Sequence, residues 1–170
     1  FTVEVGKVAE LANAECICRY GDTVVLVTPI DSSAPEGRMI LPQVQVLRDV
    51  MDLHAKAFFC QPQELSQLLS ELKTPPRLVV TDSQVYDQVS KIVPDDIYLT
   101  SFSVVLARAK GLFADYVKGT PTIDNLQDGD RVLMLESCTH NVTCEDIGRV
   151  KLPKLLAKYS GKQLQCEVVA

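Results

Sequence analysis

Three side chains that can bind a metal ion stand close together in the sequence: Cys138, His140 and Glu145. They follow the apolar run 132–135, which predicts a strand, and the stretch at 146–159 has apolar residues at helical spacing. Thiolate, imidazole and carboxylate groups are ligands of zinc and iron, and the first two residues alternate on an extended segment, so both can point to one side. The pattern therefore predicts a metal site in a turn between a strand and a helix. The alternative is a turn with one buried cysteine, because a free cysteine is usually a small core residue.

The stretch from Cys138 to Pro153 also carries a longer motif. Cys-Thr-His followed by Glu-Asp-Ile-Gly-Arg-Val-Lys-Leu-Pro resembles the cluster-binding region of HydF, the family of FeFe-hydrogenase maturation GTPases. The resemblance implies that Cys138 is a ligand of a 4Fe-4S cluster and that His140 lies at the cluster as a candidate ligand. It also implies that Glu145 can supply an oxygen to the fourth iron. A weak oxygen or nitrogen ligand suits that position because an incoming group can displace it.

The chain departs from the family's ligand set in one respect. The family's other two thiolates come from a downstream His-Cys-x-x-Cys motif, which does not occur in these 170 residues. One of the three family thiolates is therefore present, which leaves the ligand set of the cluster incomplete. Cys144 and Cys166 match no family ligand, and we interpret both as packing or incidental thiols.

The resemblance also implies a function. A complete family member is a scaffold that holds the cluster and, beside it, a di-iron precursor made by the radical-SAM maturases HydE and HydG, and delivers this precursor to the hydrogenase. The hydrogenase and both maturases are thus the implied partners. GTP would bind to a domain with a Gly-x-x-x-x-Gly-Lys-Ser/Thr loop, which this sequence lacks. We therefore expect this chain not to be an enzyme, and its start at Phe1 suggests a piece of a longer protein.

Composition narrows the remaining possibilities. Charged residues make up 23% and hydrophobic residues 46% of the chain, an ordinary globular mix. The net charge of -5 and the lack of a basic run argue against nucleic acid as a partner. Six cysteines without regular spacing, and no signal peptide or transmembrane run, indicate free thiols in a reducing compartment and no membrane association. We expect the cytoplasm, or an organelle if the host is an alga or another eukaryote.

The first 28 residues support a rival interpretation. Segments 2–8 and 15–20 alternate apolar and polar residues as half-buried strands do. Together with Gly-Asp-Thr-Val-Val-Leu-Val-Thr at 21–28 they resemble the opening strands of the RNase PH and polynucleotide phosphorylase fold, which would make the chain an RNA-processing fragment. A third interpretation is a metal-free α/β dimerisation module in which Cys138 and His140 are buried.

From residue 21 onward, strand and helix patterns alternate with short loops. Strands are predicted at 23–27, 57–60, 77–81 and 97–101, and helices at 41–53, 62–72 and 83–92. Such alternation implies right-handed crossovers and a parallel sheet. The sequence therefore predicts an α/β fold in which a small parallel sheet is flanked by helices.

The loop and helix after the first of these strands again resemble HydF. The shared motif runs from Pro-Ile-Asp at residue 29 through Ala-Pro-x-Gly-Arg to Ile-Leu-Pro-Gln-Val-Gln at residue 45, and it belongs to the family's dimerisation domain. The resemblance implies a homodimer formed through this domain, with the two sheets joined. An exposed edge strand would favour the same pairing.

Several polar residues lie where such sheets bind ligands, next to the carboxyl ends of predicted strands. They are Asp82, Ser83, Thr100 and Ser101. Asp31, Arg38 and Gln43, in the loop and helix after the first of the strands, could also be catalytic polar residues. We favour helix capping and loop ties over catalysis for all of them. His54, at the end of a predicted helix, is interpreted as a partner of the helix dipole.

A domain boundary is predicted near Phe102. Residues 1–102 would form the α/β dimerisation domain, with 1–20 of uncertain role, and 103–170 the first part of a smaller α/β cluster-binding domain. Two helices, 103–111 and 112–118, would be separated by Gly111. Three lysines, Lys151, Lys154 and Lys158, could attract an anionic iron complex, although a solvated helical face explains them more simply.

Overall fold

The computed structural model describes residues 4–5, 16–30, 37, 39–135 and 147–169 of the chain. Two compact units are present, Phe1–Asp115 and Tyr116–Ala170. No helix in the described part of the chain has the length and apolar character that crossing a membrane requires.

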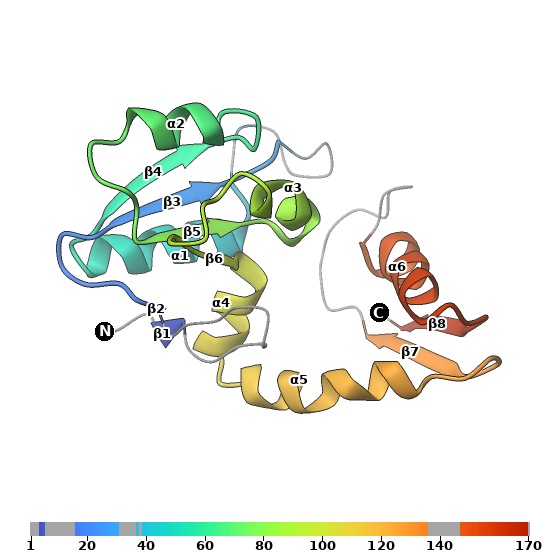
Figure 1. The fold of residues 1–170 in the computed structure, drawn as a ribbon. Coiled ribbons are helices and arrows are strands. Elements are labelled where there is room, and N and C mark those ends of the chain that lie inside the picture. The colour runs from blue at the N-terminus through green and yellow to red at the C-terminus, as the bar shows by residue number, and fades with distance from the viewer. Residues whose placement is uncertain (1–3, 6–15, 31–36, 38, 136–146, 170) are drawn as a thin grey trace. The chain divides into compact units, whose positions relative to one another are not determined.

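The first unit is built on a parallel four-stranded sheet (Figure 1). Its strands are β3 (Thr23–Val27), β4 (Lys56–Cys60), β5 (Leu78–Thr81) and β6 (Tyr98–Ser101). The helices between them are α1 (Leu41–Asp52), α2 (Leu65–Glu71) and α3 (Tyr86–Ser90), the last preceded by the 3-10 turn η1 (Ser83–Val85). The strand order β4-β3-β5-β6 means that the chain adds one strand on one side of β3 and then two on the other. The predicted α/β fold with a parallel sheet is confirmed.

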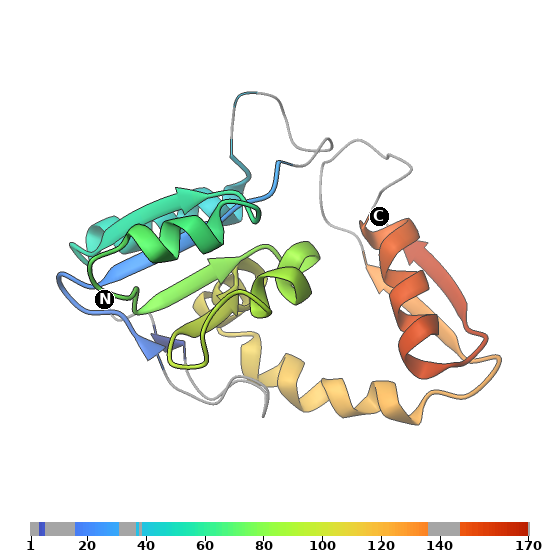
Figure 2. The same ribbon diagram turned by 45° about the horizontal axis from the view of Figure 1, so that its top comes forward.

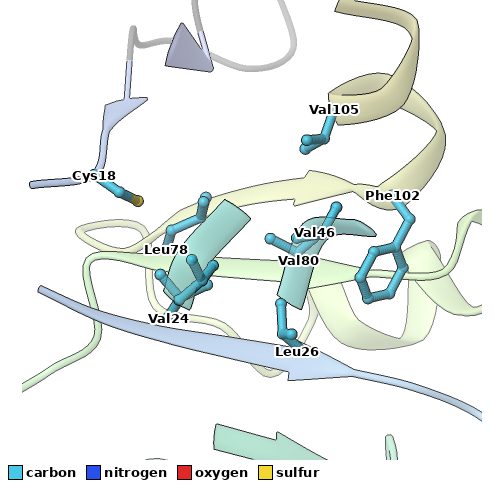
Figure 3. Close-up of a cluster of buried hydrophobic side chains, with 9 residues drawn as sticks. Cys18, Val24, Leu26, Val46, Leu78, Val80, Phe102 and Val105 are labelled. Carbon is cyan, nitrogen blue, oxygen red and sulfur yellow. The ribbon is translucent and has the colours of Figure 1, made fainter. Parts of the chain in front are cut away.

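Helices cover both faces of this sheet (Figure 2). On one face, β3 and β5 pack against α1 and α4 (Phe102–Ala109). Figure 3 shows the side chains of this layer: Cys18, Val24, Leu26, Val46, Leu78, Val80, Phe102 and Val105. The opposite face carries Val25, Val27 and Val79 against α2 and α3, through Leu65 and Val89. Burial on both faces explains why β3 reads as a continuous apolar run rather than an alternating one.

A short two-stranded ribbon precedes the sheet. Strands β1 (Glu4–Val5) and β2 (Cys16–Ile17) pair antiparallel. Strands were predicted at 2–8 and 15–20, and the rest of the first of these segments lies outside the described residues. The next residue, Cys18, is 2% exposed and belongs to the core that α1 and α4 cover.

Two helices of the first unit end in the same way. After α1, His54 has φ 52°, its N–H donates to the Met51 carbonyl, and the Ala55 N–H donates to the Val50 carbonyl. After α4, Gly111 has φ 75°. Its N–H donates to the Arg108 carbonyl, as the His54 N–H donates to the Met51 carbonyl. This is the Schellman arrangement, in which a left-handed residue turns the chain out of the helix. Gly111 was predicted to separate two helices, whereas His54 occupies a position that usually requires glycine.

Helix α4 packs with the first unit, because Phe102 and Val105 are buried in its core. The two compact units divide between Asp115 and Tyr116, within α5 (Phe113–Gly119). The functional boundary placed near Phe102 stays a prediction.

The second unit contains a pair of parallel strands and one connecting helix. Its elements are η2 (Thr120–Asn125), β7 (Arg131–Leu135), the π-helical turn η3 (Ile147–Lys151), α6 (Leu152–Ser160) and β8 (Gln165–Val169). The pairing register runs from Arg131 opposite Gln165 to Leu135 opposite Val169. Pro153 lies in the first turn of α6, directly after η3. Two members of the apolar face predicted for this helix, Leu152 and Leu155, are 45% and 59% exposed.

Candidate functional site

The three predicted cluster ligands, Cys138, His140 and Glu145, lie outside the described residues, as does Cys144. The structure describes the elements on either side of them. Strand β7 ends at Leu135 and the π-helical turn begins at Ile147. The motif therefore connects the carboxyl end of a strand to the start of a helix, as the sequence predicted.

Strand β8 contributes no predicted ligand, but it pairs with β7, the strand that precedes the candidate site. Because β7 and β8 are parallel, Val169 at the end of β8 lies opposite Leu135 at the end of β7. Residues that follow either strand must leave the sheet from the same edge. The carboxyl ends of β7 and β8 thus lie side by side at one end of this two-stranded sheet.

The other candidate residues of the second unit say less about a cluster site. Lys154 and Lys158 are exposed on α6, so an attraction between them and an anionic complex stays a prediction. Cys166 is a free, half-buried thiol in β8. Among the residues that the structure describes, no group of three or more histidine, cysteine or acidic side chains is placed to hold a metal.

Two other cysteines are committed to the core of the first unit. Cys18 is 2% and Cys60 8% exposed. Burial, assisted by the nearby Glu64 carboxylate, raises the pKa of Cys60 to about 11. The metal-binding form of cysteine is the thiolate, so Cys60 is a poor ligand at neutral pH.

The polar residues at the carboxyl edge of the four-stranded sheet mainly hold the structure together. The Ser101 hydroxyl accepts the Val104 N–H at 3.3 Å and caps α4. The Gln43 side-chain oxygen accepts the Ile40 N–H at 3.2 Å, and its amide nitrogen donates to the Asp82 carboxylate at 3.4 Å. Gln43 thus caps α1 and ties it to the segment after β5, which is the role that the sequence analysis favoured.

A second side-chain hydrogen bond joins the same edge of the sheet to α4. The Ser83 and Ser103 hydroxyls are 3.1 Å apart, a contact that no local pattern indicates because Ser103 lies inside a helix pattern. Thr100 is 5% exposed, and the buried Thr81 hydroxyl has no hydrogen-bond partner among the described residues. Asp31 and Arg38 lie outside the described residues. These groups are spread over different elements, and none of them lines the cavity described next.

A small cavity lies instead within the core layer between the sheet, α1 and α4. It has a volume of about 10 Å³, room for about one water molecule, and apolar side chains such as Val46, Val50 and Val105 line most of it. Asp49 stands at its margin, and burial, with the neighbouring Asp52 carboxylate, raises the pKa of Asp49. The cavity is too small for a substrate.

A parallel sheet of this strand order, with helices on both faces, defines the first unit as a doubly wound α/β domain, followed by a small second α/β unit. Residues 14–111 match the hydrogen maturase F dimerization domain, and residues 114–170 match the hydrogen maturase F tetramerization domain. The first match alone covers more than half of the chain. The chain therefore belongs to the hydrogen maturase F family, and both matched domains are named for self-association.

The chain is also similar to curated enzymes over a short stretch. Polyribonucleotide nucleotidyltransferases 1, 2 and 3 of Alkaliphilus metalliredigens (strain QYMF) are each 58% identical to it over 43 residues. That stretch is 25% of this chain and 6% of each enzyme, so the chain spans only a small fraction of these relatives. A resemblance to polynucleotide phosphorylases was predicted from the first 28 residues, and these enzymes are of that kind.

Proposed function

We propose that this chain is the self-associating and cluster-binding part of a scaffold for FeFe-hydrogenase maturation. In this role it forms a homodimer, helps to hold a 4Fe-4S cluster and delivers a di-iron precursor from HydE and HydG to the hydrogenase. The observation that carries the proposal is the family membership over residues 14–170, together with the Cys138 motif at the carboxyl end of β7. A reducing compartment such as the cytoplasm suits its free thiols.

The donor set of the chain fits part of a cluster site. Cys138 offers a thiolate, and His140 and Glu145 offer a nitrogen and an oxygen for the iron whose ligand must be exchangeable. A bound cluster would supply that open coordination position to the di-iron precursor. Two more thiolates are needed, and the parallel pairing of β7 and β8 favours their arrival from sequence beyond β8, because both strands end at one edge.

The decisive experiment is anaerobic reconstitution of the full-length protein with iron and sulfide, followed by EPR of the reduced sample. We expect a four-iron signal that disappears in Cys138→Ala and changes shape in Glu145→Ala. Cys166→Ala is the matched control, because this half-buried cysteine is expected to be an incidental thiol. Failure of the wild type to take up iron would leave a metal-free α/β dimerisation module.

The local similarity to polyribonucleotide nucleotidyltransferases supports an alternative function in RNA processing. An RNA-binding protein neutralises phosphates, so its affinity falls steeply with salt. Fluorescence anisotropy with a single-stranded RNA at increasing salt separates the two functions. We expect no binding, because the chain has a net charge of -5, and a steep salt dependence would favour the alternative.

A further inference from the structure

Helix α6 lies beside the β7–β8 pair within the second unit (Figures 1 and 2). Its residues divide by burial into two sides. Four residues are half-buried: Pro153, Leu156, Ala157 and Ser160. The other five are exposed: Leu152, Lys154, Leu155, Lys158 and Tyr159. Because residues three and four apart share one side of a helix, the exposed five form a continuous outer surface.

An apolar stripe runs along this outer surface. Leu152, Leu155 and Tyr159 are 45%, 59% and 70% exposed, and their spacing of three and four residues places them in one row. The Tyr159 hydroxyl donates to the Asp124 carboxylate at 2.8 Å, which holds the ring at one end of the row. A row of exposed apolar side chains beside polar ones is typical of a protein interaction site, and tyrosine is a frequent anchor there.

A row of lysines borders the apolar stripe. Lys154 and Lys158 each directly precede a member of the stripe, and both are exposed. Residues 147–162 contain five basic side chains and no acidic one, although the net charge of the chain is -5. Elsewhere, Arg48 and Lys91 each pair with a carboxylate four residues away. Lys154 and Lys158 form no ion pair with any residue that the structure describes, so the surface of α6 keeps its positive charge.

We propose that this outer side of α6 is the docking surface for a protein partner whose own surface carries carboxylates around an apolar patch. The inference rests on the function proposed above, in which a precursor passes between proteins, and it assigns that contact to α6. The partner's carboxylates pair with Lys154 and Lys158, and its apolar side chains cover Leu155 and Tyr159. A partner held there is close to Ile147, the first described residue after the segment with the candidate ligands.

Two other occupants match this surface less well. A second copy of α6 brings the same lysines and no carboxylate to the contact, because residues 147–162 contain no acid. A nucleic acid would leave the apolar stripe without a counterpart, because phosphate is bound by basic and polar groups. Charge and apolar area together therefore favour an acidic protein surface.

The test measures the affinity of the full-length protein for the purified hydrogenase, HydE and HydG, one at a time, by isothermal titration calorimetry. Lys154→Glu/Lys158→Glu reverses both charges, and we expect it to weaken the complex at least tenfold, with a smaller loss at high salt. Leu155→Ser should weaken the same complex at low and high salt alike, because apolar burial is not screened by salt. Lys73→Glu/Lys118→Glu is the matched control, because both lysines are exposed and lie outside α6.

Carbodiimide cross-linking of the wild type gives an independent answer that does not depend on whether a variant folds. The reagent joins a lysine amine to a carboxylate that touches it, and mass spectrometry locates the new amide bond. We expect bonds between Lys154 or Lys158 and acidic residues of the partner protein.

The possible failures are distinguishable. A wild type that binds none of the three proteins would overturn the transfer function itself. Binding that Lys154→Glu/Lys158→Glu retains, with no cross-link to α6, would overturn only the docking assignment. A change in the mass of this variant's own assembly on sedimentation would also overturn it, by making α6 a self-association surface. Single-stranded RNA that binds the wild type and not this variant would overturn it too, by making α6 a site for polyanions.

Discussion

The two units of the chain bury the strands of their sheets to different degrees. In the first unit, all of Val24, Val25, Leu26 and Val27 are fully buried, because helices cover both faces. In the second unit, β7 alternates between exposed and half-buried residues, and Leu133 and Leu135 are 58% and 78% exposed. A two-stranded parallel sheet with an open face is rarely stable alone, because parallel sheets are normally covered on both faces. The first unit therefore buries the central strand of its sheet on both faces, whereas the second leaves Leu133 and Leu135 exposed.

Matched leucine substitutions test this contrast most directly. Leu26→Ala should lower the free energy of unfolding by about 2–5 kcal/mol, because Leu26 is fully buried and its loss leaves a cavity. Leu135→Ala, at an exposed site in β7, should cost less than about 0.5 kcal/mol. Urea denaturation of both variants gives the comparison. A large cost for Leu135→Ala would mean that the open face is covered in solution.

The buried thiol of β4 should make the first unit sensitive to alkaline pH. The pKa of Cys60 is raised from 9.0 to about 11, so the folded state disfavours the thiolate. The corresponding stability is present below pH 9 and is lost as the pH rises from 9 toward 11. Urea denaturation across this range should show the loss, and Cys60→Ala should reduce it. An unchanged pH profile in Cys60→Ala would assign the loss to other groups.

The N-cap of α4 should contribute a smaller amount. Ser101→Ala removes the oxygen that accepts the Val104 N–H and should cost about 1 kcal/mol. Ser101→Asp, which restores an acceptor, should recover part of this loss in thermal denaturation. If both variants unfold at the wild-type temperature, the cap contributes nothing measurable.

Substitutions of the two left-handed residues after α1 and α4 should have effects of opposite signs. His54→Gly should raise the free energy of unfolding by up to about 1 kcal/mol, because glycine adopts φ 52° without strain. Gly111→Ala should lower it by about 1 kcal/mol for the same reason, since Gly111 has φ 75°. Thermal denaturation of the two variants side by side checks the signs. Loss of stability in His54→Gly would show that the imidazole contributes more than its backbone strain costs.

Local sequence patterns predicted most elements of the first unit. The continuous apolar run at 23–27 has the length and the β-branched residues of a strand buried on both faces, and it is β3. Gly111 marked a helix end because few other residues adopt its backbone angles. The cluster motif was placed correctly between a strand and a helix, while the ligand roles of Cys138, His140 and Glu145 stay predictions.

The sequence by itself thus determined which segments are strands and helices and the α/β class that their alternation implies, because these follow from side-chain periodicity within one segment. Only the tertiary structure decided which of the apolar residues in each segment are buried. In α1, Leu41 and Val44 fit helical spacing as well as Val46 and Val50 do, yet only the latter pair meets the sheet. The strand order and the packing of α4 on the first unit were likewise decided by contacts between distant segments. No local pattern contains those contacts, because they depend on the free energy of packing whole elements together.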